Sequence, residues 1–352
     1  MSSPSVFRAP RGPRMAAAVL ITVLSIALAE VSIGSAPWGL LNPVQWILLV
    51  PIYGAQTLLI ASVVLRRQEH PTLAALWSAG VVMGLYEFYI TRVLWDQPWD
   101  EAVNSQLLEW PSLVVVAGFY HPFVSVILPM MLAEQVLVRR PTLPSMLPRW
   151  WRAPGRARVW WGVAIAGVVA GGLYKPHGIA ALPALGLTGV AVWAVVRWAR
   201  RAPQVESLMD ALPARRGRVI AWALVVLVFA PFVALAQVGE DAVPLARQAV
   251  ALALYGVFVG LAWANLRNGR APRLTIMPRS TRWWVARASV GVAVALAAVA
   301  VPFTEAVSIL VVWGGGAVVA LTMLGVAIVG AMRSRPAPPA PAAPRRDPLA
   351  QS

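Results

Sequence analysis

A succession of apolar runs, each close to the length of a membrane-spanning helix, dominates this chain of 352 residues. A helix needs about 20 apolar residues to cross the hydrocarbon core of a bilayer. Only 12% of the residues are charged, against roughly 25% in a soluble domain, so the solvent around this chain must be largely lipid. We therefore predict an all-α, polytopic integral membrane helix bundle with about ten transmembrane helices. The ten runs cover approximately residues 15–34, 44–65, 72–95, 111–137, 159–174, 178–198, 219–238, 245–265, 285–303 and 307–331.

The charged residues between the runs predict how the helices are oriented. Every second loop is basic, beginning before the first run, and the loops between are uncharged or acidic; of the 30 basic residues only Arg92, Lys175 and Arg247 break the pattern. Basic loops remain on the cytoplasmic side of a membrane. We therefore predict that both termini are cytoplasmic and that the protein lies in the plasma membrane, the inner membrane of a bacterial cell. As an open alternative, runs 159–174 and 178–198 form a re-entrant hairpin.

The composition divides the chain into two membrane halves. Residues 15–138 contain four runs and nearly all of the polar residues inside the membrane, whereas residues 159–331 contain six runs made mostly of Ala, Val, Leu and Gly. A basic cytoplasmic loop, 139–158, separates the halves. A basic cytoplasmic N-terminus, 1–14, precedes them, and the Pro/Ala/Arg-rich tail 332–352 is predicted to be a disordered cytoplasmic end.

The net charge of +16 bears on the partners. In a soluble protein it would suggest nucleic acid, but here the positive charges lie in short loops between apolar runs, so we expect no nucleic-acid partner. The expected partners are the lipid bilayer and, at the basic loops, anionic lipid headgroups. The sequence has no cysteine and no Walker or Rossmann glycine motif, so we expect no cofactor and no metal. A zinc site of Glu87, His121 and His177 is conceivable, although no H-E-x-x-H spacing supports it.

Glu87, inside the run 72–95, is the strongest indication of a functional site. An ionisable side chain inside a spanning helix is costly and by default marks a site. Gly80, Gly84 and Glu87 follow at spacings of four and three, which places them on one stripe of a helix. The pattern Gly80-x-x-x-Gly84 favours close helix packing. We therefore predict that Glu87 faces a neighbouring helix rather than lipid.

Other polar residues of the first four runs are expected near the same depth. With a rise of ~1.5 Å per residue, Glu30 and Glu87 both lie ~22 Å from the inner ends of their helices, and His121 lies ~15 Å below its outer end. Tyr53 and Gln56 are expected near mid-membrane. These positions predict an outward-facing polar pocket in the first four helices. Its predicted ligand-binding residues are Glu30, Tyr53, Gln56, Glu87, Arg92 and His121.

Several of these residues also have a structural interpretation: Glu30 as an interfacial residue at a helix end, and Arg92 as a side chain that reaches the outer headgroups. Glu87 could hold helices together by pairing with Arg92 or by hydrogen bonding to Tyr53 or Gln56. His121 precedes Pro122 inside a run, and could simply satisfy backbone groups that the proline leaves unpaired. Glu134, at the inner end of its run, is expected to be a solvated interfacial residue.

Two resemblances follow from these residues. Glu87 and Arg92 fit the first and last positions of E-E-x-x-x-R, a motif of the intramembrane CAAX-protease family, which the chain weakly resembles. Phe88 replaces the second glutamate, and Ala117 stands where the family's F-x-x-x-H has phenylalanine. The resemblance implies that Glu87 would activate water and His121 would assist. More broadly, stretches such as G-L-Y-E-F-Y-I-T-R-V-L-W and H-P-F-V-S-V-I-L-P resemble uncharacterised prokaryotic polytopic membrane proteins, over the first four runs only and with no activity attached.

These observations favour transport or binding over catalysis. We expect the protein to transport or bind a small ligand or ion through the pocket, with Glu87 as the central ionisable group. One alternative is an intramembrane glutamate-dependent hydrolase that uses Glu87 and His121. The other is a non-catalytic membrane scaffold or assembly subunit.

Overall fold

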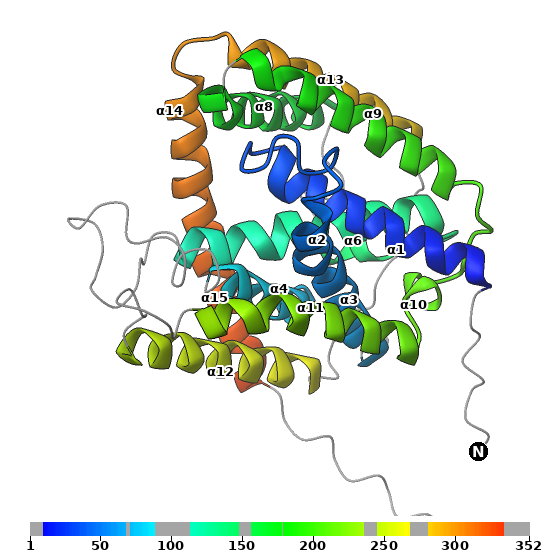
Figure 1. Cartoon of the computed structure of the whole chain (residues 1–352), viewed down its shortest axis with the longest axis vertical. Helices are drawn as coiled ribbons and strands as arrows, with labels where there is room; N and C mark the ends of the chain where they lie inside the picture. Colours follow the sequence, from blue (N-terminus) through cyan, green and yellow to red (C-terminus); the bar gives the residue numbers. More distant parts are fainter. Residues whose placement is uncertain are drawn as a thin grey trace, which may run out of the picture.

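The computed structural model describes residues 10–67, 71–88, 113–147, 156–177, 179–235, 245–267 and 281–333, which form a bundle of helices (Figure 1). The predicted apolar runs coincide, over their described residues, with these helices. The all-α membrane bundle is thereby confirmed, whereas the number of spans and their orientation remain predictions. Judged by length and composition alone, six described helices can cross a bilayer: Arg11–Val31, Trp46–Arg66, Leu113–Leu137, Leu182–Ala199, Gln248–Arg267 and Thr304–Met332.

Helices from the N-terminal half form the centre of the bundle. Three of their spans are 61%, 72% and 61% buried within the protein, whereas three spans of the C-terminal half are only 22%, 17% and 17% buried. The N-terminal helices therefore supply the core, and the C-terminal helices present most of their surface to lipid. The central segments are α1 (Arg11–Ile26) with the π-helical η1 (Ala27–Val31); α2 (Trp46–Leu49), π-helical η2 (Val50–Ala55) and α3 (Gln56–Arg67); α4 (Leu73–Phe88); and π-helical η4 (Leu113–Ile127) with α6 (Leu128–Leu137).

C-terminal helices cover this core from several directions (Figure 1). α9 packs on α1, α11 packs on α3, α12 packs on α4, and α15 packs on η4, while α8 packs on α13 and α14. Each of these central helices is therefore packed against a helix of the C-terminal half. The covering segments are α8 (Arg156–Tyr174), α9 (Leu182–Ala199), α11 (Arg215–Leu235), α12 (Leu245–Arg267), α13 (Thr281–Val299), α14 (Thr304–Ile309), η8 (Leu310–Gly315) and α15 (Gly316–Met332). The short segments η5 (Leu143–Met146), η6 (Lys175–His177), η7 (Ile179–Ala181) and α10 (Leu208–Ala211) lie in the connections.

The predicted glycine stripe on α4 makes a close helix contact. A Cβ added to Gly80 would lie 2.7 Å from the Cα atom of Pro122, and one added to Gly84 would lie 2.6 Å from the Cα atom of Ala117. Real side-chain carbons do not approach a backbone atom so closely, so only glycine permits this approach. The α4–η4 contact therefore fixes the helix that carries Glu87 against the helix that carries His121.

Two further glycine pairs with the same spacing behave differently from each other. A Cβ on Gly167 would meet the carbonyl oxygen of Gly291 at 2.7 Å, and Gly171 likewise faces the backbone of α13. By contrast, an added Cβ on Gly256 or Gly260 has nothing within 4 Å. Only the first of these two pairs serves helix packing in the described structure.

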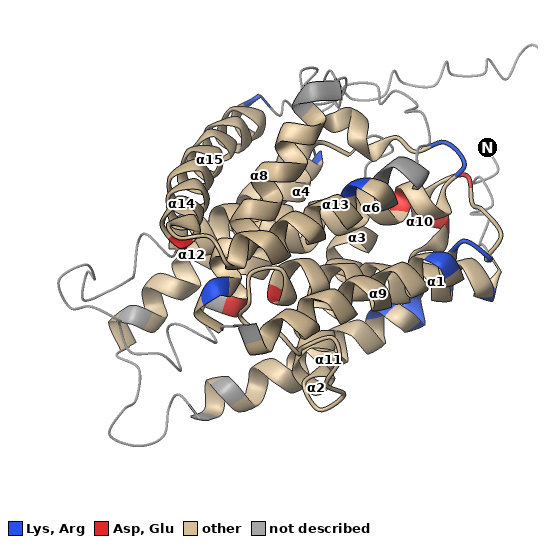
Figure 2. Cartoon of the chain, turned by 90° about the horizontal axis from the view of Figure 1, so that it is seen from above, with Lys and Arg blue, Asp and Glu red and all other residues tan. Residues whose placement is uncertain are grey.

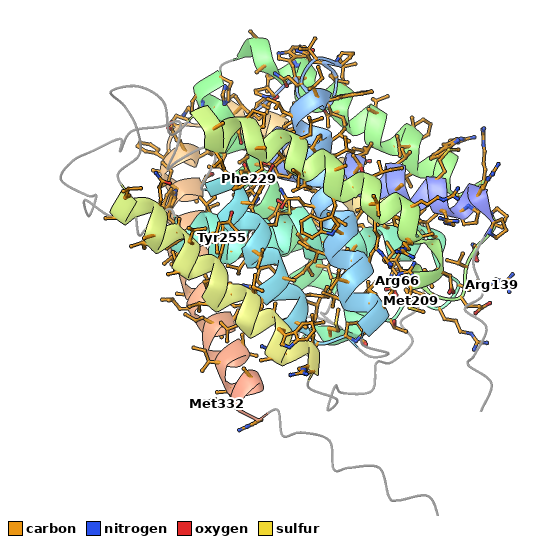
Figure 3. All side chains as sticks on the ribbon, turned by 60° about the horizontal axis from the view of Figure 1, so that its bottom comes forward. Arg66, Arg139, Met209, Phe229, Tyr255 and Met332 are labelled. Carbon is orange, nitrogen blue, oxygen red and sulfur yellow. The ribbon has the colours of Figure 1, made fainter. Side chains whose placement is uncertain are left out.

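Aromatic contacts attach α11 and α12 to α4. Tyr86 lies 5.1 Å from Phe229 between ring centroids, and its hydroxyl donates to the carbonyl oxygen of Val225 at 3.2 Å. Trp77 makes an edge contact with Phe258 at 6.0 Å. Figure 3 shows Phe229 on α11 and Tyr255 on α12.

The loop that follows α6 corrects the expectation that Glu134 is solvated. Glu134 is only 3% exposed, and its carboxylate accepts hydrogen bonds from Thr142 N at 3.0 Å and Leu143 N at 2.8 Å. The Thr142 hydroxyl donates to the same carboxylate at 3.2 Å. Glu134 therefore anchors the loop to the end of α6, at the end of the bundle where arginines gather beside α1 and α10 (Figure 2).

Candidate functional site

Four of the predicted site residues meet in the centre of the bundle. Glu30 lies on η1, Tyr53 on η2, Glu87 in the last turn of α4 and His121 on η4. The Tyr53 hydroxyl is hydrogen-bonded to Oε1 of Glu30 and, at 2.5 Å, to Oε1 of Glu87. On the other side of Glu87, its Oε2 lies 3.1 Å from Nε2 of His121. We call these four residues the carboxyl–histidine cluster.

The cluster is largely shielded from its surroundings. Tyr53 and His121 are each 1% exposed, Glu30 is 8% exposed and the side chain of Glu87 is 15% exposed. The rings of Tyr53 and His121 stack with centroids 6.0 Å apart. Glu87 is therefore the member of the cluster that is most accessible from outside the protein.

The hydrogen bonds of Tyr53 constrain where protons reside. A tyrosine hydroxyl has one proton to donate, yet this hydroxyl contacts two carboxyl groups. If it donates to one carboxylate, the contact with the other is favourable only when that carboxyl group carries a proton and donates to the tyrosine oxygen. The geometry therefore fits a cluster in which Glu30 and Glu87 share at least one proton between them.

His121 extends the cluster by one more residue. Its Nδ1 atom lies 3.1 Å from Oγ of Ser125, while Nε2 faces Glu87. A neutral imidazole carries a proton on one nitrogen and accepts at the other. With its proton on Nε2, which faces Glu87 at ion-pair distance, the imidazole accepts the hydroxyl proton of Ser125 at Nδ1.

The ring of His121 does not bond the backbone groups that Pro122 leaves unpaired, which was the structural interpretation of this residue. Pro122 has no N–H group, so it leaves a carbonyl of the preceding turn without a backbone donor. In this structure the indole of Trp77 donates to the carbonyl oxygen of Gly118, four residues before Pro122, at 2.7 Å. The ring of His121 contacts Glu87 and Ser125 instead.

A layer of buried hydroxyl groups next to His121 was not predicted from the sequence. Ser25 and Thr57 donate to the carbonyl oxygen of Ser125 at 2.8 and 3.0 Å. That carbonyl lies in the last turn of π-helical η4, four residues before Pro129, which has no N–H group to donate. The signal that could have located this layer is Pro129, although the partners on α1 and α3 depend on packing.

Three members of the cluster lie on π-helical segments. Glu30 is on η1, Tyr53 on η2 and His121 on η4. π-Helical turns are rare and frequently occur at functional sites. A neighbouring side chain bonds the backbone of η1, because the Tyr120 hydroxyl donates to the carbonyl oxygen of Ala29 and lies 3.2 Å from that of Leu28.

Gln56 and Arg92 are the remaining residues predicted for this site. Gln56 is 7% exposed on α3, and its Nε2 atom has no hydrogen-bond partner among the described residues. Arg92 lies outside the described residues. The ring of His177 lies 5.8 Å from that of Tyr174, and Lys175 donates to the carbonyl oxygen of Val301. Within the described ranges, no group of three or more His, Asp or Glu residues is arranged to hold a metal ion.

Comparison with known proteins gives this molecule a family. The chain belongs to an uncharacterised membrane protein family, whose model matches residues 19–337. A protein of Archaeoglobus fulgidus, named as an uncharacterised protein, is 32% identical over 126 residues, which are 36% of this chain and 40% of that protein. The chain thus spans less than half of that relative. No solved structure matches the chain.

These matches confirm the resemblance to uncharacterised membrane proteins and the membrane location. They do not support the resemblance to CAAX proteases, which stays confined to Glu87 and Arg92.

Proposed function

We propose that the carboxyl–histidine cluster binds and transfers protons, and that this proton exchange accompanies the transport or binding of a small ligand or ion. The observation that carries the proposal is the Tyr53 hydroxyl, which is hydrogen-bonded to carboxyl groups from two different helices. Rows of Glu, Asp and His inside membranes characterise the proton relays of pumps and transporters.

Electrostatics supports the same proposal. Two ionised carboxylates held by one hydroxyl inside a bilayer would repel each other at high cost, because little solvent screens them. One shared proton removes most of that repulsion. A cation entering beside Glu87, the more exposed carboxyl group, would remove it as well. Proton and cation would then compete for one site, which is the elementary requirement for coupled exchange.

The proposal places the ligand near Glu87, with Gln56, three residues after Tyr53, as a further contact, while the predicted contribution of Arg92 stays a prediction. An unpaired buried amide donor costs about 1–3 kcal/mol, and Gln56 Nε2 is such a group among the described residues. A polar ligand that accepted this donor would recover the loss. The proposed pocket opens toward the outside of the membrane, in keeping with the predicted orientation of α4.

Infrared difference spectroscopy on the reconstituted protein tests proton binding by the cluster. Between acidic and alkaline buffer, the carbonyl band of a protonated carboxyl group should appear in the wild type and be lost or reduced in E30Q and in E87Q. In Y53F the band should shift, because the hydroxyl that joins the carboxyl groups is gone. Y174F is the matched control, since Tyr174 is fully buried but outside the cluster. An unchanged band in E30Q, E87Q and Y53F would refute the proposal.

Proton movement can be followed in the same set of variants. Proteoliposomes containing a pH-sensitive dye should acidify or alkalinise when an ion gradient is applied, and E30Q and E87Q should abolish the response. E305Q, which changes an exposed glutamate, should respond as the wild type does. Equal responses from all four proteins would count against coupled exchange.

The contact between Glu87 and His121 supports a second candidate, the intramembrane hydrolase. A carboxylate 3.1 Å from an imidazole is a suitable general base with an assisting group. The two functions differ in their need for Glu30. A hydrolase requires Glu87 and His121 and tolerates E30Q, whereas the relay requires both glutamates. Cleavage of a membrane-embedded peptide that survives E30Q but not E87Q would favour the hydrolase.

A further inference from the structure

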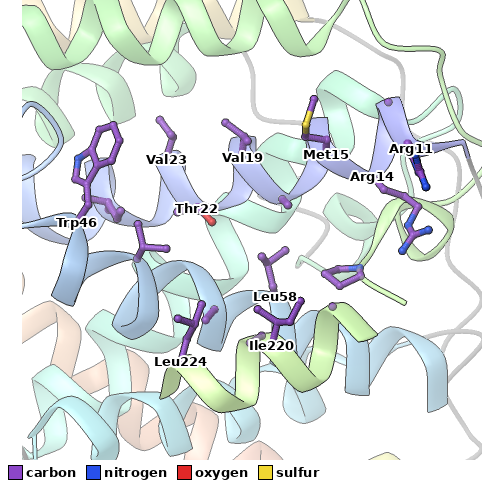
Figure 4. A pocket seen from close by; sticks show the side chains of 18 of the residues that line it. Arg11, Arg14, Met15, Val19, Thr22, Val23, Trp46, Leu58, Ile220 and Leu224 are labelled. Carbon is purple, nitrogen blue, oxygen red and sulfur yellow. The ribbon is translucent and has the colours of Figure 1, made fainter. Parts of the chain in front are cut away.

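A second feature of the molecule is an apolar groove between α1, the α2–η2–α3 segment and α11. Its volume is about 960 Å³. Figure 4 shows Arg11 and Arg14 at one end and Trp46 at the other, with Leu58, Ile220 and Leu224 between. The lining residues are Arg11, Gly12, Arg14, Met15, Ala18, Val19, Thr22, Val23, Ile26, Leu40, Trp46, Val50, Ala55, Leu58, Pro213, Gly217, Ile220, Ala221 and Leu224.

Charge is concentrated at one end of this groove. Arg11 and Arg14 are the charged members of its described lining, and a spacing of three places them on the same face of α1. They precede the first apolar run and belong to the end that the charge pattern assigns to the cytoplasm. The groove therefore begins with two guanidinium groups at the membrane surface and continues into the hydrocarbon layer.

The length and walls of the groove suit an acyl chain. From Arg14 to Ile26 the helix rises by about 18 Å, at ~1.5 Å per residue. One leaflet contributes roughly 15 Å of a ~30 Å hydrocarbon core. Met15 and Ile220 on the two walls are 59% and 61% exposed, so lipid can reach both. Small side chains such as Ala18 and Ala221 leave the space between the walls open.

We propose that this groove binds an anionic phospholipid of the cytoplasmic leaflet, with its phosphate on Arg11 and Arg14 and an acyl chain between α1 and α11. Guanidinium groups bind phosphate oxygens through paired, charge-assisted hydrogen bonds. Anionic lipids supply the negative potential of that leaflet. An apolar groove this long excludes a free phosphate as its main occupant, because only a lipid fills both the charged end and the apolar length. The inference does not depend on the proposed proton relay.

Photo-cross-linking in nanodiscs tests the inference. The probes are phosphatidylglycerol and phosphatidylcholine that carry the same photoreactive group on an acyl chain, in a phosphatidylcholine background. Wild-type protein should give several-fold more adduct with the glycerol lipid, on peptides that cover residues 15–26 and 220–224. R11Q/R14Q should lower the yield to that of the choline lipid. R200Q/R201Q, which neutralises two exposed arginines at the end of α9 outside the groove, should leave it unchanged.

Several outcomes would overturn the inference. Equal adduct yields for the two lipids, or adducts distributed over other helices, would show that lipid is not selected by this groove. Equal losses in R11Q/R14Q and R200Q/R201Q would indicate a general effect of surface charge. Protection by soluble glycerol phosphate would assign the arginines to a free phosphate compound.

A groove-filling variant guards against misfolding of the arginine variant. A18F keeps both arginines and inserts a ring into the groove. It should lose the adduct while its helical content stays that of the wild type, and a retained adduct would also overturn the inference.

Discussion

Replacing Gly84 by alanine should separate α4 from η4 and disturb the carboxyl–histidine cluster at the same time. The new Cβ would lie 2.6 Å from the Cα atom of Ala117 and 2.9 Å from its carbonyl oxygen. Carbon atoms in good contact lie about 3.5–4.0 Å apart. Because the obstacle is backbone, the two helices must move apart by about 1 Å.

The energetic consequence follows from that displacement. Inserting a methyl group into a well-packed contact costs about 1–3 kcal/mol, and alanine recovers about 1 kcal/mol of helix propensity relative to glycine. G256A receives the same gain in propensity, but its Cβ has nothing within 4 Å. Subtracting the two variants therefore cancels the propensity term. We expect G84A to be less stable than G256A by about 1–3 kcal/mol.

The cluster should respond as well, because Gly84 precedes Glu87 by three residues and Ala117 precedes His121 by four. An opening of about 1 Å would lengthen the 3.1 Å contact between Glu87 and His121 beyond hydrogen-bonding range. Equilibrium unfolding in mixed micelles measures the free energy, and the infrared carboxyl band measures the cluster. Equal free energies of unfolding for G84A and G256A, or a G84A band identical to that of the wild type, would refute this reasoning.

Three other substitutions probe single hydrogen bonds. E134Q should lower the free energy of unfolding by about 1–3 kcal/mol, because Thr142 N and Leu143 N donate to different carboxylate oxygens and glutamine replaces one of them by an NH₂ group that cannot accept; exposed E305Q should be neutral, and a neutral E134Q would contradict the anchoring role. N265L should cost about 0.6 kcal/mol, a typical value for a side-chain hydrogen bond between membrane helices, because Asn265 Nδ2 donates to the carbonyl oxygen of Ala327 at 3.0 Å. T322V, which removes a hydrogen bond within one helix, is its control, and equal losses would count against an α12–α15 link. W77F keeps an aromatic ring but leaves the carbonyl of Gly118 without its side-chain donor. The free energy of unfolding should therefore fall by about 1–3 kcal/mol. Unchanged stability would show that this bond is dispensable.

Features that depend only on composition and on residue spacing along the chain were predictable from the sequence. Apolar length and the scarcity of charge suffice for an all-α membrane bundle, since lipid leaves the backbone few other ways to satisfy its hydrogen bonds. Helical rise places Glu30, Glu87 and His121 near one depth, and the structure brings all three together. The glycine stripe on α4 correctly indicated the face that carries Glu87.

Features that depend on which segment packs opposite a residue were not predictable from the sequence. Gly80/Gly84 and Gly256/Gly260 have the same spacing, yet only the former pair has backbone opposite it. Glu134 resembles any carboxylate at a helix end until the following loop is seen to fold onto it. The π-helical turns lack a sequence signal altogether, because they reflect a local balance between backbone geometry and packing.

Two groups of polar side chains in the central helices differ in what they bond. Tyr120, Trp77, Ser25 and Thr57 donate to backbone carbonyls that π-helical turns or prolines have disturbed. The members of the carboxyl–histidine cluster bond to one another instead. Side chains that merely repair the backbone do not require ionisable groups, since hydroxyl and indole groups already supply those donors here. The cluster is therefore an addition to the repaired framework, and its own bonds are the ones whose strength changes when a proton arrives or leaves.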